Sequence, residues 1–324
     1  MKAIFLDALS MGNDLDFTAL ESSVAQLICH DYTPSELVVK RLQGAAIAVV
    51  NKVVIDGNVM AQCPHLKLIT VTATGTNNID LAAAQQYGIR VCNAIRYGRA
   101  ALVQHNFSLL LALAGNLLAY LNDVRAGKWQ QATQFCLMDH PIMELEGKTL
   151  GIVGYGDLGQ GMAEMARAFG MKVLVAASTT PSESSPSSGA AAPARLPLSE
   201  ILPRVDVLSI HCLLSDATRN LITLNELKHM KPTALLLNTA RGGIVAESDL
   251  LFAVKEGIIA GAGVDVLTEE PPKQGNPLLK ENLPNLLVTP HCAWASREAR
   301  QRILTITSDS IQRFLRGEPQ RFVV

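Results

Sequence analysis

Three polar side chains that could carry out acid–base chemistry each follow an apolar run in the second half of the sequence. Arg241 follows a run ending at Asn238, Glu270 follows one ending at Val266, and His291 follows one ending at Val288. Ligands of an open α/β sheet bind outside the carboxyl ends of its strands, so the three side chains are expected at one edge. Arg241 could bind a carboxylate through two hydrogen bonds, and His291 could exchange a proton while Glu270 orients and charges its imidazole.

Each of these residues also has an ordinary interpretation. Arg241 could be a surface ion-pair partner, Glu270 could end a solvated loop, and His291 could be a structural histidine. The catalytic interpretation gains weight because the three lie downstream of a dinucleotide motif.

That motif is a G-x-G-x-x-G turn formed by Gly154, Gly156 and Gly159. An apolar strand precedes it, an amphipathic helix beginning near Gln160 follows, and a second strand, 171–177, completes a βαβ unit. The first glycine permits the tight turn, the second lets the backbone approach a pyrophosphate, and the third lets helix and strand pack closely. The segment therefore predicts a dinucleotide site, and its position after about 150 residues requires another domain around it.

Composition bounds the remaining possibilities. The chain has 324 residues, which is enough for two domains, and a formal net charge of −1, which gives no bias toward nucleic acid or anionic membranes. Its six cysteines show neither a C-x-x-C pair nor zinc-site spacing, so we expect reduced cysteines, a cytoplasmic protein and no metal. The N-terminus reads as a first strand instead of a signal peptide, and the apolar stretch 107–121 is too short and polar for a membrane span.

Short apolar runs alternate with helical patterns through both halves of the chain. The pattern predicts an α/β fold with two doubly wound parallel sheets. Segment 178–197, rich in Ser, Pro and Ala, is expected to be a surface loop. The expected strands are 3–6, 46–50, 68–72, 91–92, 149–153, 171–177, 205–211, 234–238 and 261–266, with a helix at 80–87 and one long apolar helix at 101–121.

In these motifs the chain resembles the D-isomer-specific 2-hydroxyacid dehydrogenases over nearly its whole length. The segments that carry the resemblance are 154–159, 238–243, 265–271 and 291, while 73–80 and 291–299 look like the glycerate dehydrogenase or hydroxypyruvate reductase branch. The resemblance implies a Rossmann cofactor domain, residues 99–290, inserted into a flavodoxin-like catalytic domain, residues 1–98 and 291–324. Hinges are expected near 97–99 and 289–290.

The resemblance also implies residue roles. The catalytic residues would be Arg241, Glu270 and His291. The cofactor would contact Gly154, Gly156, Asp157, Leu158, Gly159, Ser178, Thr179, His211, Cys212, Leu213, Thr218, Thr239, Ala240, Arg241, Asp265, His291 and Ala293. The substrate would contact Asn51, Lys52, Thr74, Gly75, Arg241, His291 and Trp294, although Asn51 and Lys52 could equally lie in an exposed loop.

The end of the second fingerprint strand bears on cofactor choice. NAD-specific folds usually place an acid there to bind the ribose 2′-hydroxyl, but this chain has Ala177, Ser178 and Thr179. No acid repels a 2′-phosphate, and the three hydroxyls at 178–180 can donate to it, but no adjacent cation attracts it. The sequence therefore permits either NAD or NADP, with a slight preference for NADP.

The expected reaction is hydride transfer between a nicotinamide and a small 2-keto or 2-hydroxy acid, with D-glycerate and hydroxypyruvate as the leading pair. The use of glyoxylate as a further substrate is left open by the sequence. The alternatives are a dehydrogenase for phosphoglycerate or another 2-keto acid, and a non-catalytic corepressor-like protein that senses NAD(H). The apolar helix 101–121 is expected to pack against its mate in a homodimer, burial within a monomer being the alternative.

Overall fold

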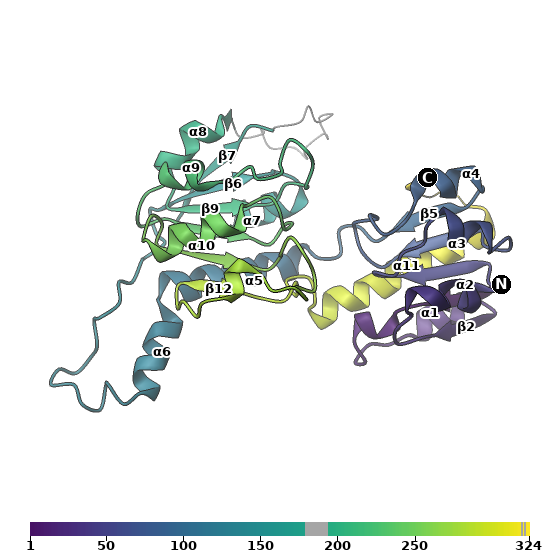
Figure 1. The fold of residues 1–324 in the computed structure, drawn as a ribbon, viewed down its shortest axis with the longest axis horizontal. Coiled ribbons are helices and arrows are strands. Elements are labelled where there is room, and N and C mark those ends of the chain that lie inside the picture. Colours follow the sequence, from purple (N-terminus) through teal and green to yellow (C-terminus); the bar gives the residue numbers. More distant parts are fainter. Residues whose placement is uncertain (179–193, 319, 321) are drawn as a thin grey trace. The chain divides into compact units, whose positions relative to one another are not determined.

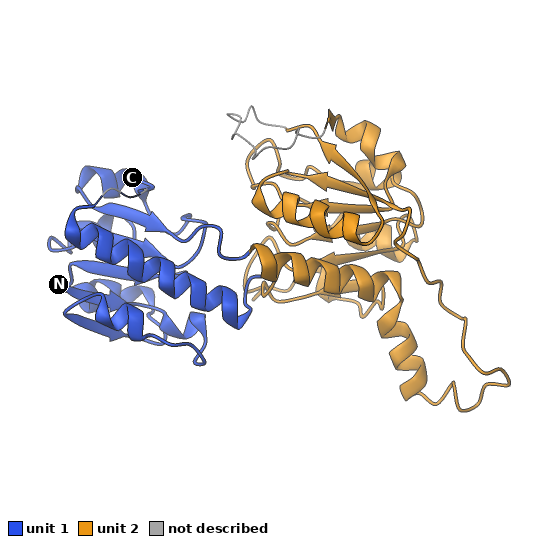
Figure 2. Cartoon of the chain, turned by 180° about the vertical axis from the view of Figure 1, so that it is seen from behind, with its two compact units in different colours: residues 1–98, 294–324 blue, residues 99–293 orange. Residues whose placement is uncertain are grey.

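The computed structural model describes residues 1–178, 194–318, 320 and 322–324. The chain forms two compact units, residues 1–98 with 294–324 (unit 1) and residues 99–293 (unit 2) (Figure 2). Each unit is an α/β sandwich around its own parallel sheet, as the sequence predicted.

Unit 1 contains a five-stranded parallel sheet in the order β2-β1-β3-β4-β5, the flavodoxin-like order (Figure 1). Its strands are β1 (Lys2–Phe5), β2 (Gln26–Cys29), β3 (Ile47–Val50), β4 (Leu68–Val71) and β5 (Arg90–Asn93). Its α-helices are α1 (Thr18–Ser22), α2 (Val38–Leu42), α3 (Gly57–Ala61), α4 (Leu81–Gln86) and α11 (Arg297–Arg316), and short 3₁₀ turns cover Ala8–Met11 and Ser35–Leu37.

Side chains of the unit 1 strands alternate between two apolar layers. Ile4 and Ile69 pack in the layer that contains residues of α2, α3 and α4, whereas Phe5 and Leu68 pack in the layer that contains residues of α1 and α11. Strands buried on both faces read as continuous apolar runs, which is why the sequence revealed β1, β3 and β4. The edge strand β2 is partly exposed along its length and was missed.

Unit 2 contains a seven-stranded parallel sheet in the order β12-β11-β10-β9-β6-β7-β8. Six of these strands, taken across the sheet as β8-β7-β6-β9-β10-β11, follow the Rossmann order, and β12 is added at the edge beside β11. The strands are β6 (Thr149–Val153), β7 (Lys172–Ala176), β8 (Arg195–Leu196), β9 (Val207–Ile210), β10 (Leu235–Asn238), β11 (Gly261–Val264) and β12 (Leu286–Val288). The helices are α5 (Arg99–Ala114), α6 (Leu117–Arg125), α7 (Asp157–Ala168), α8 (Leu198–Ile201), α9 (Leu224–Lys228) and α10 (Glu247–Lys255), with 3₁₀ turns at Leu202–Arg204 and Pro277–Leu279.

The two faces of this sheet are also covered by separate helices. Leu110 of α5 and Met162 of α7 pack with Leu237 on one face. Ile201 of α8 and Leu250 of α10 pack with Leu236 on the other. The fingerprint strand β6 lies between β7 and β9, where the strand order reverses, so the glycine turn is at the topological switch point.

The predicted long helix 101–121 is wrong as a single element. It is two helices, α5 and α6, because Asn116 adopts a left-handed conformation with φ 47° and starts a new helix after Gly115. The two axes are bent by 59°. Within the described residues no single helix is long and apolar enough to cross a membrane, and only this bent pair passes by length and composition.

The chain returns to unit 1 after Ala293, whereas the sequence predicted a return after Pro290. The intervening residues stay with unit 2 because the backbone N–H groups of His291, Cys292 and Ala293 all donate to Asp265. The sequence predicted a surface loop at 178–197. Near the end of this segment, residues 195–196 form the short strand β8, and residues 179–193 lie outside the described residues.

Candidate active site

The glycine turn after β6 has the close contacts that the sequence predicted. Gly154 has φ +93°, and a Cβ there would lie 2.5 Å from the backbone N of Cys212. A Cβ on Gly159 would overlap with the carbonyl oxygen of Gly154, so the start of α7 packs directly on the turn. Both positions therefore exclude any larger residue.

The same turn leaves space where a dinucleotide needs it. Nothing lies within 4 Å of the position that a Cβ of Gly156 would take. Helix α7 begins at Asp157, and its N-cap residue Gly156 makes no side-chain cap hydrogen bond. The first N–H groups of an α-helix have no acceptor within the helix, so this first turn can donate to a ligand. Exposed N–H groups at a helix N-terminus bind phosphate, and the residues present fit a pyrophosphate.

The loop after β9 forms the next side of this edge. The buried hydroxyl of Thr218 donates to the carbonyl of Leu213 at 2.7 Å and accepts from the N–H of Ser215 at 2.8 Å. Thr218 thus holds the loop, while the Leu213 side chain is 75% exposed and Cys212 is half-buried.

His211 is placed at the end of β9 with its imidazole buried. Ser209 Oγ lies 2.8 Å from its Nε2, and Nδ1 has no hydrogen-bond partner among the described residues. Burial lowers the pKa of His211 to about 4, so the imidazole is neutral at ordinary pH.

Arg241 lies in the loop after β10. The Asn238 side chain braces this loop by donating to the Arg241 carbonyl at 3.0 Å and accepting from the Ala240 N–H at 3.1 Å. Arg241 Nη1 donates to the Ala240 carbonyl at 2.7 Å. A Cβ on Gly242 would overlap with the carbonyl oxygen of Leu267, so the loop that carries Arg241 lies directly against the segment that leads to Glu270.

Glu270 and His291 form a hydrogen-bonded pair, with Glu270 Oε2 2.6 Å from His291 Nδ1. The other carboxylate oxygen, Oε1, accepts from the N–H of Leu267 at 2.8 Å. His291 has φ 53°, and its N–H donates to the Asp265 carbonyl at 2.8 Å. About a third of each side chain remains exposed, so solvent partly screens the pair.

The sequence did not predict the hydrogen-bond network that positions His291. The carboxylate of Asp265, 1% exposed, accepts from the Thr289 hydroxyl and from the N–H groups of Cys292 at 2.9 Å and Ala293 at 2.8 Å. His105 Nε2 of α5 lies 3.0 Å from Thr289 Oγ1. The sequence feature that pointed to this contact of α5 was the polar stretch 104–106 in an otherwise apolar helix.

Asn106, the neighbour of His105, reaches a second loop. Its Nδ2 lies 2.7 Å from Thr239 Oγ1, so α5 contacts the loops that follow both β10 and β12. Ligand atoms of His105, Asp265 and Cys292 lie within 4.8 Å of one another, close enough to suggest a metal. The carboxylate is already satisfied by the donors above, and the cluster is accounted for as a hydrogen-bond network.

The remaining predicted substrate residues belong to unit 1 and follow β3 and β4. Asn51 is 3% exposed and donates from Nδ2 to Ser10 Oγ at 3.0 Å, so the exposed-loop alternative is wrong for it. Asp7, which no sequence motif marked, holds this turn by accepting from the N–H groups of Asn51, Lys52 and Val53 at 2.7–3.1 Å.

The other members of this set are also held by unit 1. Thr74 donates from its hydroxyl to the Ala94 carbonyl at 3.0 Å, and Gly75 follows it in the same loop after β4. Trp294 packs edge-on against Tyr97, with ring centroids 6.5 Å apart. Their contact with a substrate stays a prediction.

The predicted ribose site lies at the end of β7. Ala177 and Ser178 are exposed there, and Thr179 lies outside the described residues. In the register of the sheet, Arg195 of β8 is paired with Val175, two residues before Ala177. An arginine therefore lies on the neighbouring strand, although none was adjacent in sequence.

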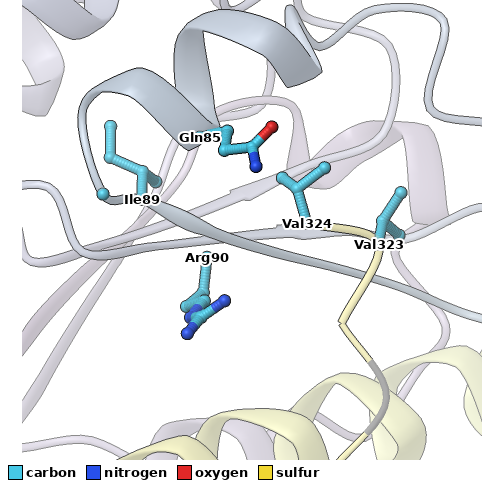
Figure 3. A pocket seen from close by; sticks show the side chains of 6 residues that line it. Gln85, Ile89, Arg90, Val323 and Val324 are labelled. Atoms are coloured by element: carbon cyan, nitrogen blue, oxygen red, sulfur yellow. The ribbon is translucent and has the colours of Figure 1, made fainter.

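Unit 1 also has a cavity of about 480 Å³ (Figure 3). It is lined by residues 85, 88–90, 323 and 324, at the edge where Val323 and Val324 hydrogen-bond to Val91. None of the predicted site residues lines it.

The fold and the glycine turn define a class of protein, an α/β protein with a dinucleotide-binding unit and a polar cluster at the carboxyl edge of the same sheet. A model of the D-isomer specific 2-hydroxyacid dehydrogenase NAD-binding domain matches residues 107–293. The chain belongs to this family.

Relatives of known name match over the full length. The chain is 44% identical to the glycerate dehydrogenase of Methylorubrum extorquens, covering 99% of this chain and 98% of the relative. It is 35% identical to the hydroxypyruvate reductase of Blautia hydrogenotrophica, covering 100% and 99%. Among solved structures, a Thermus thermophilus protein matches with a TM-score of 0.82 and 32% identity, and an acyclic imino acid reductase in complex with NADPH and D-Arg with 0.85 and 27%, each covering both chains fully.

The depressed pKa of His211 predicts an acid-labile unit 2. Unfolding exposes the imidazole, whose pKa returns to about 6.5, so stability is lost as pH falls from 6.5 toward 4. Over that range His211 alone should remove about 3 kcal/mol from the free energy of unfolding. Denaturant titrations at several pH values should show a shallower loss in His211→Asn, and equal slopes in the two proteins would contradict the assignment.

Proposed function

We propose that this protein reduces hydroxypyruvate to D-glycerate, and catalyses the reverse oxidation, with a nicotinamide dinucleotide. The observation that carries the proposal is the 2.6 Å pair of His291 and Glu270 on the same sheet edge as the glycine turn. A reduced nicotinamide supplies a hydride when bound, and the keto oxygen then needs one proton. Protonated His291, hydrogen-bonded to Glu270, can donate this proton as a general acid.

The chain's own residues have separate tasks in this reaction. Arg241 binds the substrate carboxylate with its guanidinium and polarises the keto oxygen. His291 shares Nδ1 with Glu270, which directs proton transfer through Nε2. Glu270 stabilises the protonated imidazole in the reductive direction. Asn51, Lys52, Thr74, Gly75 and Trp294 are proposed to complete substrate binding from unit 1.

The substrate assignment rests on the named relatives. Proteins similar over the full chain include a glycerate dehydrogenase and a hydroxypyruvate reductase, and several glyoxylate reductases match about four-fifths of the chain. We therefore propose hydroxypyruvate as the main substrate and glyoxylate as a secondary one.

Purified protein should oxidise NADPH or NADH when hydroxypyruvate is added, and it should do so faster than with phosphohydroxypyruvate or bulkier 2-keto acids.

The same assay separates the alternatives. A protein that only senses NAD(H) would bind the dinucleotide without turnover. Faster turnover of a phosphorylated or bulkier acid would instead move the substrate to another member of the family.

For the cofactor we propose a slight preference for NADP over NAD. NAD-specific proteins usually have an acid at this strand end, which would repel a 2′-phosphate, whereas this chain has the exposed Ala177 and Ser178. Arg195 on the neighbouring strand is a cation that could attract the phosphate. The solved acyclic imino acid reductase, 27% identical, contains NADPH.

We also propose a homodimer. Helix α6 and the segment after it extend away from the unit 2 sheet (Figure 1) and expose large apolar side chains on both. The exposed fractions are 50% at Leu117, 42% at Leu121, 53% at Trp129, 89% at Phe135 and 84% at Met138. Contiguous exposed apolar surface marks an interaction site, and a second copy would cover it.

The free cysteines support a cytoplasmic location.

Replacing Arg241 by Lys should abolish most activity without loss of dinucleotide binding. A point charge cannot reproduce the two-pronged contact to carboxylate and keto oxygen, and losing such a contact costs about 2.7–4 kcal/mol in the barrier. Arg219→Lys, at an exposed position, is the control. Near-unchanged kcat/KM in Arg241→Lys would rule out the proposed role.

The pH profile should report the Glu270–His291 pair. Reduction requires a protonated His291 and oxidation a neutral one, so kcat/KM for the keto acid should fall with rising pH while that for the hydroxy acid rises. Glu270→Gln removes the charge that favours imidazolium, and the reductive limb should move to lower pH. If the limb stays in place in this variant, the two residues do not act together.

Cofactor preference should respond to position 177. Ala177→Asp installs an acceptor for the NAD ribose and repels the NADP phosphate, which should lower the NADPH to NADH ratio of kcat/KM at least about tenfold. Arg195→Ala should selectively weaken the use of NADPH. Lys172→Ala, at the other end of β7, is the control and should leave the NADPH to NADH ratio of kcat/KM unchanged. An unmodified protein strictly dependent on NADH, with a ratio untouched by Ala177→Asp, would refute the placement of the ribose.

A further inference from the structure

The glycine turn contains a carboxylate at a position where a phosphate is expected. Asp157 is the first residue of α7 and lies between the second and third glycines of the motif. An acid in the first turn stabilises a helix, because the N-terminus carries partial positive charge. The same acid repels a pyrophosphate that uses that N-terminus. The chain must offset this charge if it binds a dinucleotide.

Arg99, the first residue of α5, pairs with that acid. Its Nη1 lies 3.2 Å from Asp157 Oδ1, and its Nη2 lies 2.6 Å from Glu164 Oε2. The guanidinium thus lies along α7 and contacts the acids at the first and eighth positions of the helix. Both acids raise the pKa of Arg99, with Glu164 contributing most.

Gly161 makes room for this arrangement. It lies between the two acids in the middle of α7, where glycine is unfavourable for a helix. A Cβ at this position would lie 2.8 Å from Val103 Cγ2, 2.9 Å from Arg99 Nε and 3.2 Å from Arg99 Cγ, so it would collide with α5 at both residues. The missing side chain therefore allows the arginine to cross the helix and reach Asp157.

We propose that Arg99 neutralises Asp157 and holds its carboxylate along α7, so that the helix N-terminus can accept the pyrophosphate of the cofactor. Arg99 is a positioning residue in this account, because it acts through Asp157. The inference rests on the proposed dinucleotide binding but adds a residue that lies more than 50 positions before the glycine motif in sequence.

A double-mutant cycle on dinucleotide affinity tests the proposal. Dissociation constants for NADH and NADPH are measured by fluorescence titration of the unmodified protein, Arg99→Gln, Asp157→Asn and the double variant. Arg99→Gln should weaken both roughly five- to tenfold, the size expected for one uncompensated charge close to the phosphates near a surface. Asp157→Asn keeps the backbone N–H of this residue and removes only the side-chain charge, so it should change affinity less than Arg99→Gln does, and adding it to Arg99→Gln should restore binding.

Controls separate this effect from folding and from the chemistry of the nicotinamide. Arg167→Gln removes a charge from the last turn of the same helix and should leave affinity unchanged. ADP-ribose, which carries the pyrophosphate without nicotinamide, should show the same losses in competition with NADH.

Three results would overturn the inference. One is unchanged affinity in Arg99→Gln, and another is a double variant that binds as weakly as Arg99→Gln, which would mean that Arg99 acts without Asp157. The third, decisive even if Arg99→Gln does not fold, is a gain of fivefold or more in Asp157→Asn, because the carboxylate would then be uncompensated in the unmodified protein. Unmodified protein that binds neither dinucleotide would instead overturn the proposed function, and this inference with it.

Discussion

The buried carboxylate of Asp265 organises the reactive edge of unit 2. It accepts from the Thr289 hydroxyl and from two successive N–H groups, those of Cys292 and Ala293. These contacts tie the ends of β11 and β12 together and keep the segment that carries His291 with unit 2. A buried carboxylate needs such donors, because an unpaired charge in the interior is costly. The geometry of the His291–Glu270 pair depends on this anchor, since His291 has no regular element of its own to fix it.

Much of this architecture could be predicted because its signals are local. Parallel strands covered on both faces read as apolar runs, and the glycine turn needs three residues whose spacing is visible in one segment. Arg241, Glu270 and His291 stood out because each follows such a strand. The structure places all three at the carboxyl edge of one sheet and pairs two of them. Their roles in chemistry follow from that placement and from the family, and they stay proposals.

What the sequence did not reveal depends on contacts between distant segments. Asp7 accepts from backbone N–H groups, and Asp265 accepts from two of them, and such groups have no sequence signature. Only the polar interruption at 104–106 pointed to the side-chain part of the Asp265 network. The break between α5 and α6 depends on the left-handed conformation of Asn116, and the missed strand β2 is an exposed edge without an apolar run. Arg99 is 58 residues from Asp157, and only the packing of α5 on α7 brings them together. Such tertiary contacts override local patterns.

The proposed site supports direct hydride transfer to C2 of a small keto acid with proton donation to its oxygen. The most direct measurement uses nicotinamide dinucleotide deuterated at the reactive face of C4, with hydroxypyruvate as acceptor, and analyses the product by mass spectrometry and chiral chromatography. The expected product is D-glycerate carrying one deuterium at C2. Unlabelled glycerate, the L-isomer, or binding of the reduced cofactor without any product would contradict it.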